Sequence, residues 1–340
     1  MLPIDDVSKE ARDLHREAVV VDLHADTPDL MRLGFDFHAR HLPLLPAGLC
    51  FGHLDGPRMK QGGLTAQVFG LFVMAWFFRR RFWERILEQV DATHATVSRR
   101  PDGLRLVRTA EEIRQAKRDG VPAGMFCLEG AHPLAGRLDR LEELIPRGLR
   151  AVGFLHFVDN EAGAPAMGRG RNTHEALRPF GRALVEFCNE RGLLIDLAHI
   201  NRPGFLEAAR LSRAPVMVSH TGVTGVKPHR RNIDDDQIRA VADTGGCIGI
   251  IYARNFLGGA GLDRLMLHLE HVLRVGGEDC PALGSDFDGY VLPPRGLADV
   301  TTLPRITDRL LHRGHAPRVV RKILGGNALR VIEAVPPRTP

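Results

Sequence analysis

Eight short, mostly apolar runs recur along the 340-residue chain and limit the folds that it can adopt. Near-continuous apolar runs are typical of parallel β-strands that are covered on both faces. The runs occupy residues 18–26, 64–73, 123–130, 150–157, 192–199, 214–220, 245–252 and 280–289. Segments with helical patterns lie between them, at 81–100, 174–192, 202–212, 235–246 and 261–277. This alternation predicts an α/β protein with a (β/α)8 TIM barrel, and an open doubly wound sheet is the alternative.

The alternation runs through the chain without a linker, a low-complexity tract or an internal repeat. We therefore expect a single (β/α)8 barrel domain over residues 1–340, with short N- and C-terminal extensions. No G-x-G-x-x-G sequence follows the first run, which disfavours a dinucleotide-binding sheet.

The charge balance is only slightly basic, with 46 Lys and Arg against 41 Asp and Glu. The one dense basic cluster, residues 79–85, fits the solvated start of a helix better than a nucleic-acid site. The chain contains no recognised nucleic-acid motif, so we expect no nucleic-acid partner.

The cysteines and the termini bear on the cellular compartment. Five scattered cysteines without a C-x-x-C motif are typical of reduced thiols, and Cys127 is expected to face the barrel interior as a small apolar filler. The N-terminus lacks the apolar segment of a signal peptide, and the longest apolar run, 71–78, is too short to span a bilayer. We therefore expect a cytoplasmic protein with no membrane partner.

Ionisable side chains gather at the C-terminal ends of the apolar runs. In the first run, Asp22, His24 and Asp26 alternate with apolar residues and so share one face of a strand. A surface hairpin could explain an isolated His-x-Asp pair, but six of the eight runs end in this way. The ionisable residues at these ends are His24, Asp26, Glu129, His156, His199, His220 and Asp286. In barrels of this kind the C-terminal strand ends build the active site, so the pattern predicts one there.

Imidazole and carboxylate groups are ligands of zinc and similar divalent ions. The His-x-Asp pair, Glu129 and two further histidines supply five ligands, which exceeds the three that a single catalytic zinc usually takes from protein. The set fits two metals that share a bridging carboxylate. Each histidine alone could be a hydrogen-bonded core residue, and Glu129 alone could form an ion pair. Together, without metal, they would leave costly unpaired polar groups in the barrel.

The strand-end sequences also resemble those of a known family. The motifs are "DLHADTP", "GGLTAQVF", "LEGAHPL", "LHFVDN", "PFGRALVEFCNERGLLIDLAH", "VSHTG", "RRNIDDD", "GSDFDG" and "ILGGNALRVIE". Over residues 18–333 the chain resembles the renal or membrane dipeptidase family of zinc peptidases, within the amidohydrolase-like barrels. The resemblance implies one zinc on His24 and Asp26, a second on His199 and His220, and Glu129 as the ligand that bridges both.

The resemblance also implies roles for three further residues. His156 would reach the substrate carbonyl oxygen, Arg231 would bind the substrate carboxylate, and Asp286 would shuttle the proton. The alternative for Arg231 is a surface salt bridge to the aspartates at 234–236. The sequence departs from the family after the seventh run, where it reads "IIYARNF" and Tyr252 is displaced from the position of a carboxylate-binding tyrosine.

The expected function is therefore a dipeptidase with two zinc ions that hydrolyses short peptides with a free C-terminal carboxylate. By the resemblance, a D-residue at the C-terminal position is expected to be tolerated. Three alternatives stay open: another metal-dependent amide or lactam hydrolase, including a tailoring peptidase for a natural product; a metal-binding protein without catalysis; and a nucleic-acid binder. The oligomeric state is also open, with a homodimer as one alternative.

Overall fold

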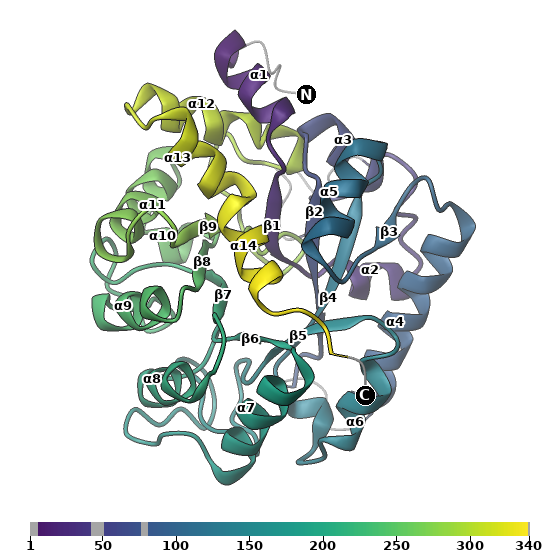
Figure 1. Ribbon diagram of the computed structural model, residues 1–340, viewed down its shortest axis with the longest axis vertical. Helices are drawn as coiled ribbons and strands as arrows, with labels where there is room; N and C mark the ends of the chain where they lie inside the picture. Colours follow the sequence, from purple (N-terminus) through teal and green to yellow (C-terminus); the bar gives the residue numbers. More distant parts are fainter. Residues whose placement is uncertain (1–5, 42–50, 76–80, 339–340) are drawn as a thin grey trace.

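Eight parallel strands close into a ring at the centre of the molecule (Figure 1). The computed structural model describes residues 6–41, 51–75 and 81–338. The ring strands are β1 (Val21–Ala25), β2 (Ala66–Phe72), β4 (Ala123–Glu129), β5 (Leu149–Gly153), β6 (Leu194–Asp196), β7 (Met217–Thr221), β8 (Cys247–Ile250) and β9 (Pro281–Leu283). Neighbours pair in this order, and β9 pairs back to β1 at Asp22 and Leu283. The predicted (β/α)8 barrel is confirmed, and each apolar run overlaps one ring strand; β5 begins one residue before its run and β7 ends one residue after its run.

One further strand, β3 (Arg105–Leu106), was not predicted. It pairs with the first residues of β4 and takes no part in closing the ring. Two residues are too few to show a hydrophobic period, so this strand has no sequence signal.

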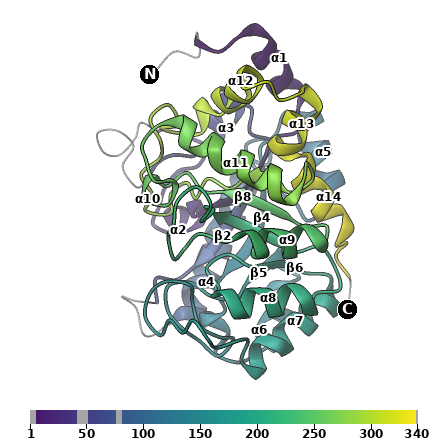
Figure 2. The ribbon, with the colours of Figure 1, turned by 90° about the vertical axis from the view of Figure 1, so that its left-hand side faces the viewer.

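Helices form an outer layer around the strands in both views (Figures 1 and 2). The five predicted helical segments contain α4 (Phe82–Arg99), α7 (Pro179–Arg191), α8 (Arg202–Leu211), α9 (Asp235–Asp243) and α11 (Leu262–Gly276). Helix α7 begins five residues later than predicted, because Pro179 occupies its first turn and Arg178 is extended. The other helices are α1 (Lys9–Glu17), α2 (Thr27–Arg32), α3 (Gly56–Gly62), α5 (Ala110–Asp119), α6 (Asp139–Leu144), α10 (Arg254–Leu257), α12 (Pro304–His312), α13 (Pro317–Arg321) and α14 (Asn327–Ala334).

Helix α14 and the residues after it cover the end of the barrel where the strands begin. Asn327 donates to the carbonyl oxygens of Glu278 and Pro281 at the start of β9. Arg150, at the start of β5, is fully buried and donates to the carbonyl oxygens of Gly192 and Val335. These bonds satisfy buried carbonyl groups and join the C-terminal segment to the starts of β5 and β9.

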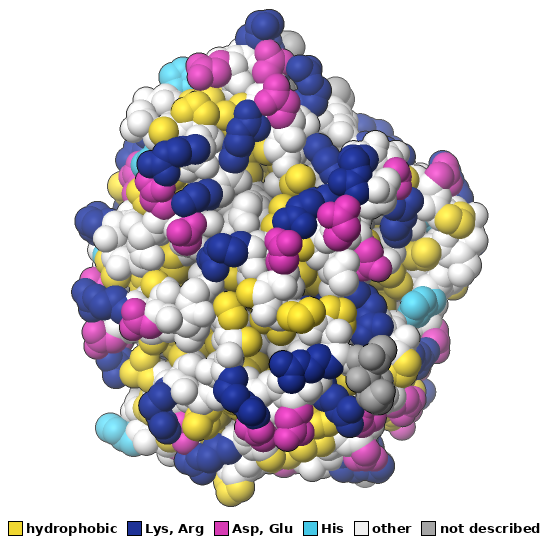
Figure 3. Space-filling model, viewed as in Figure 1, with side chains coloured by type: hydrophobic (Ala, Val, Ile, Leu, Met, Phe, Trp, Pro, Cys, Tyr) yellow, Lys and Arg dark blue, Asp and Glu magenta, His cyan; other side chains and the backbone are white. Residues whose placement is uncertain are grey.

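Four of the five cysteines and part of the basic cluster lie within the described residues. Cys127, Cys188, Cys247 and Cys280 are free and buried, while Cys50 lies outside the described residues. Arg81, in the described part of the basic cluster, caps α4 and is exposed. Basic and acidic side chains are interspersed on the face seen in Figure 3. In the described ranges, none of the helices has the length and apolar character that crossing a bilayer requires.

Candidate metal centre and substrate pocket

The predicted site residues converge at the C-terminal end of the barrel. His24 lies on β1, Glu129 ends β4, and His220 lies on β7. Asp26 directly follows β1 and precedes α2. The remaining three residues each come three positions after the last residue of a strand: His156 after β5, His199 after β6 and Asp286 after β9.

The positions of His199 and Asp286 correct the prediction that these residues lie on strands. The strands end early because the backbone turns into the left-handed region, with φ of 67° at His199 and 61° at Asp286. Asp288 and Tyr290 follow with φ of 65° and 60°. Such angles are uncommon for residues other than glycine, and they concentrate at functional sites. Of these four residues, His199, Asp286 and Tyr290 line the pocket at the mouth of the barrel.

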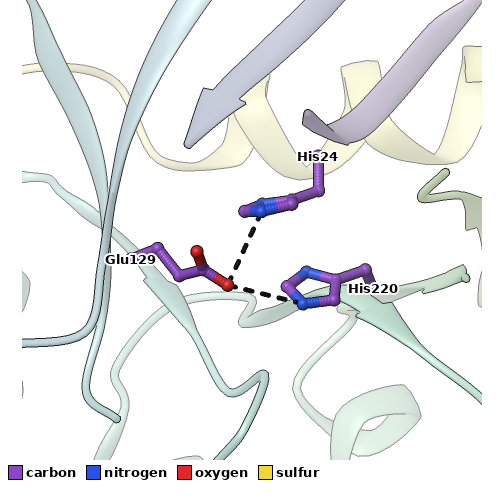
Figure 4. A group of neighbouring side chains, drawn as sticks. All are labelled: His24, Glu129 and His220. Carbon is purple, nitrogen blue, oxygen red and sulfur yellow. Dashed lines mark ion pairs between the residues drawn. The ribbon is translucent and has the colours of Figure 1, made fainter. Parts of the chain in front are cut away.

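Glu129 lies at the centre of the cluster (Figure 4). Its Oε1 atom is 3.1 Å from Nε2 of His199 and 3.5 Å from Nε2 of His220. The same oxygen is 3.6 Å from Nε2 of His24 and 3.9 Å from Nε2 of His156. One buried carboxylate oxygen therefore faces imidazole nitrogens that come from four different strand ends.

The other predicted ligands and the predicted proton shuttle, Asp286, lie close to this oxygen. Asp26 Oδ1 is 3.2 Å from Nε2 of His24, and Asp286 Oδ1 is 3.9 Å from the same nitrogen. The Nε2 atoms of His199 and His220 lie only 2.8 Å apart. Ligand atoms within 4.8 Å of one another occur in three groups, which are His24, Glu129 and His220; Glu129, His156 and His199; and His24, Asp26 and Asp286.

Several atoms of this cluster lack the hydrogen bonds that buried polar groups normally make. Both ring nitrogens of His24, Asp26 Oδ1 and Glu129 Oε2 are buried and have no hydrogen-bond partner in the described parts of the chain. Leaving such groups unsatisfied costs about 1–3 kcal/mol each. Nitrogen and oxygen donors crowded in this way fit divalent metal binding, which would satisfy them.

Two glycines leave room for the carboxylates of Asp26 and Asp286. A Cβ atom on Gly70 of β2 would come within 2.6 Å of Asp26 Oδ1 and 2.7 Å of His24 Cε1. A Cβ atom on Gly289 would come within 2.1 Å of Asp286 Oδ1. Side chains at these positions would displace the carboxylates, so the backbone at both glycines is part of the site.

Burial and mutual attraction shift the protonation of the cluster. Burial works against the charged form of Glu129, but His156 and His24 outweigh it, so the Glu129 pKa lies well below its ordinary value. Burial also disfavours protonation of His24, yet Glu129 and Asp26 raise the His24 pKa well above its ordinary value. Burial, with Arg231 nearby, lowers the pKa of His199 well below its ordinary value. An ionised Glu129 and a neutral His199 are the forms in which these groups bind metals.

The two groups predicted to act on the substrate are also perturbed. Burial and then the carboxylates of Asp26 and Glu129 raise the Asp286 pKa well above its ordinary value, although His24 opposes this. Burial lowers the pKa of His156 to about 4, so its imidazole is neutral at pH 7. A raised carboxyl pKa is typical of groups that carry protons in active sites.

Two aspartates deeper in the barrel hold the strand ends together. Asp22 accepts hydrogen bonds from the backbone nitrogens of His24 and Ser285, which joins β1 to the chain after β9. Asp196 accepts from the backbone nitrogens of Ala198 and Ser219, which joins the ends of β6 and β7. Asp22 also accepts a hydrogen bond from Gln67 Nε2 at 3.1 Å. The role of Asp196 was not predicted. The signal for Asp196 was present in the sequence as a carboxylate inside an apolar run.

A second unpredicted link fastens the loop after β9. Asp288 is buried and accepts hydrogen bonds from Thr27 Oγ1 at 2.7 Å and from the His53 backbone nitrogen at 2.8 Å. The His53 ring accepts from the Asp288 backbone nitrogen at 3.0 Å. This link joins the segment that carries Asp26 to the loop that carries Asp286.

A pocket of about 230 Å³ opens over the cluster, and its lining includes Arg231. Arg231 is buried and donates through Nη2 to the carbonyl oxygen of His220 at 2.7 Å. Its Nε atom has no hydrogen-bond partner in the described ranges. Burial lowers its pKa to about 10, although Asp286 and Glu129 oppose this, so the guanidinium stays charged at pH 7.

The surface salt bridge considered for Arg231 does not form. Asp234 and Asp236 pair with Arg202, each at 2.6 Å, and Asp235 pairs with His271 at 2.6 Å.

Tyr252 does not supply the missing tyrosine of the pocket. Its side chain is fully buried, its ring packs at a right angle to Phe287, and it does not line the pocket. The lining after β8 is formed instead by Ile251 and residues 253–256.

Comparison with known proteins agrees with this geometry. The model of the membrane dipeptidase family, peptidase family M19, matches residues 8–337. A metallo peptidase from Rhodobacter sphaeroides, liganded with a phosphinate mimic of the dipeptide L-Ala-D-Ala, is 28% identical in sequence. Its TM-score is 0.81, and the match covers 94% of this chain and 100% of that one. A metallo peptidase of family M19 named dipeptidase AC is 30% identical, with a TM-score of 0.80 and coverage of 94% and 98%.

A third solved structure shares the fold at lower identity. The probable dipeptidase PvdM from Pseudomonas aeruginosa is 20% identical, with a TM-score of 0.88 and coverage of 96% and 98%. The family match extends over nearly the whole chain and includes every residue of the cluster. The chain therefore belongs to the membrane dipeptidase family, peptidase family M19, and is a metal-dependent dipeptidase.

Proposed function

We propose that this protein hydrolyses dipeptides with a free C-terminal carboxylate by means of two divalent cations, most simply zinc. The observation that carries the proposal is the position of Glu129, whose Oε1 atom faces four imidazole nitrogens at 3.1–3.9 Å. A single carboxylate in contact with ligands on both sides is the arrangement that a bridged pair of metals requires.

The metal assignment follows from the neighbours of Glu129. His24 and Asp26 would hold one cation, His199 and His220 would hold the other, and Glu129 would serve both. The distance of 3.2 Å between His24 and Asp26 and that of 2.8 Å between the two other histidines support this division. When bound, such metals lower the pKa of water towards 7 and polarise a carbonyl group.

The residues of the chain supply the remaining chemistry. Asp286 lies beside the His24–Asp26 pair and is placed to accept a proton from the attacking water and return it to the leaving amine. His156 is a neutral imidazole on the other side of Glu129, and it can donate a hydrogen bond to the oxygen on which negative charge develops.

Arg231 would fix the length of the substrate. It is a buried cation in the pocket with no carboxylate within ion-pairing distance among the described residues. A substrate α-carboxylate would therefore supply the counter-ion of its guanidinium group. Because Arg231 would hold the substrate by its α-carboxylate, the length of the peptide matters more than the configuration of its C-terminal residue. The Rhodobacter metallo peptidase, which was liganded with an L-Ala-D-Ala mimic, supports tolerance of a D-residue here. Four free, buried cysteines support the proposed cytoplasmic location.

The test compares four substrates that differ only at the C-terminal end. We expect hydrolysis of L-Ala-L-Ala and L-Ala-D-Ala, slow hydrolysis of L-Ala-L-Ala-L-Ala, and almost none of L-Ala-L-Ala amide. Metal content should be about two equivalents per chain, and a chelator should remove both metal and activity. Equal rates on dipeptide, tripeptide and amide would favour a broader amidohydrolase and contradict the carboxylate anchor.

A further inference from the structure

Arg254 is a charged residue of the substrate pocket that the proposed chemistry does not use. Four other charged residues line the pocket in the described structure, namely Asp26, Glu129, Arg231 and Asp286. All four are buried and already have roles, whereas Arg254 is partly exposed. The same lining also contains apolar side chains, including Phe72, Met74, Phe256 and Val291.

The guanidinium of Arg254 is held at one side only. Its backbone nitrogen donates to the Leu292 carbonyl oxygen at 3.2 Å, and its Nε donates to the Pro293 carbonyl oxygen at 2.7 Å. Among the described residues, no carboxylate lies within ion-pairing distance of Arg254, and Nη1 and Nη2 have no acceptor. These two nitrogens form the fork with which arginine binds a carboxylate through two parallel hydrogen bonds.

The loop of Arg254 is fastened to the loop of Arg231. Arg231 follows β7, and Arg254 begins α10 after β8, the neighbouring strand. The Nδ2 atom of Asn232, next to Arg231, donates to the Phe256 carbonyl oxygen at 2.9 Å. The rings of His229 and Phe256 also pack with their centroids 4.8 Å apart. The two guanidinium groups therefore have a fixed relation within one pocket, which suits a ligand with two carboxylates.

We propose that Arg254 is a specificity-determining residue that binds the side-chain carboxylate of an aspartate or glutamate at the C-terminal position of the substrate. The inference rests on the proposed function, in which Arg231 binds the α-carboxylate of the same residue. Because the two arginines lie on neighbouring loops, the side chain that extends from that residue reaches Arg254. The apolar surroundings strengthen the pairing because they exclude water.

The experiment measures kcat/KM for L-Ala-L-Glu and for its uncharged isostere L-Ala-L-Gln with the metal-loaded enzyme. We expect a preference of about tenfold for the acidic dipeptide, the effect of one hydrogen-bonded charged group. Arg254→Met should bring the ratio close to one, and Arg254→Glu should shift the preference to L-Ala-L-Lys. Arg295→Met is the matched control, because Arg295 is exposed, lies outside the pocket lining and has no described ion pair. This variant should keep the wild-type ratio.

The outcomes separate this inference from the function on which it rests. If wild type hydrolyses both dipeptides with a ratio near one, Arg254 does not select an acidic side chain. An equal loss on both substrates in Arg254→Met would assign Arg254 to the α-carboxylate or to the fold, and would overturn the inference. A preference for L-Glu-L-Ala over L-Gln-L-Ala that is lost in Arg254→Met would show that Arg254 binds an acidic side chain at the N-terminal position. That result would overturn the inference. Failure to hydrolyse any dipeptide would instead refute the proposed function.

Discussion

Replacement of Glu129 by glutamine tests the metal centre at its most connected residue. The substitution keeps the shape of the side chain and removes its charge. Glu129 Oε1 lies 3.1–3.9 Å from Nε2 of His24, His156, His199 and His220. Removing its charge should therefore weaken metal binding at both proposed cation sites at once. We therefore expect both cations to be lost, and not one.

The size of the effect has a lower bound. Loss of a residue that only supports a metal ligand costs about 10–100-fold in metal affinity, and a shared direct ligand should cost more. A decrease of at least about 100-fold at each site corresponds to about 2.8 kcal/mol per site. After dialysis against metal-free buffer, the variant should retain well under one equivalent of metal, and dipeptide hydrolysis should fall at least about 1000-fold.

The assay pairs elemental analysis of the dialysed protein with initial rates on L-Ala-L-Ala. The control is Glu143→Gln, which makes the same change of charge at an exposed glutamate on α6 with no described ion pair. That variant should keep wild-type metal and rate. Retention of two equivalents and full activity in Glu129→Gln would refute the bridging role. Loss of one equivalent with the other tightly held would show that Glu129 serves one cation alone.

Three further predictions concern other residues. Asp286→Asn should keep its metal but lower kcat by roughly 10²–10⁴, as expected for a lost proton-transfer group, and loss of metal would make Asp286 a ligand. Arg231→Met should raise KM for dipeptides and reduce the difference in kcat/KM between a dipeptide and its amide. An unchanged difference would show that Arg231 does not bind the substrate carboxylate. His15 is buried against Thr307 and the Gly62 carbonyl oxygen, and burial lowers its pKa to about 4 from an ordinary 6.5. The unfolded chain takes up this proton first, so wild type should lose up to about 1.4 kcal/mol of stability per pH unit from 6.5 towards 4. Urea unfolding of His15→Gln should show a shallower pH dependence, and equal slopes would contradict the assignment.

The barrel could be predicted from the sequence because its strands are buried on both faces. Each ring strand leaves a local signal, a short apolar run, and the alternation with helices determines the class of fold. The short strand β3 and the late start of α7 at Pro179 lack such a signal. The cover formed by α14 depends on contacts such as that of Arg150 with Val335, which are remote in sequence.

The site could be predicted to the extent that its residues stand at strand ends. His24, Glu129 and His220 lie on strands, so the apolar pattern itself indicates where they point. The left-handed backbone at Asp286 has no such signature, because residues other than glycine rarely adopt it. The link between His53 and Asp288 was likewise missed, because it joins positions 235 residues apart.

The closure of the ring between β9 and β1 has a consequence for biosynthesis. Strand β1 takes one neighbour from β2, shortly after it in the chain, and the other from β9, where Asp22 is aligned with Leu283. At a translation rate of about 5–20 residues per second, the ribosome needs about 13–50 s to add the roughly 260 residues between them. Throughout this interval one edge of β1 has no partner, and His24 and Asp26 lack Asp286. The complete catalytic site, with Asp286 in place, can therefore form only when synthesis of the chain is nearly finished, and the onset of activity is a late event in the maturation of the enzyme.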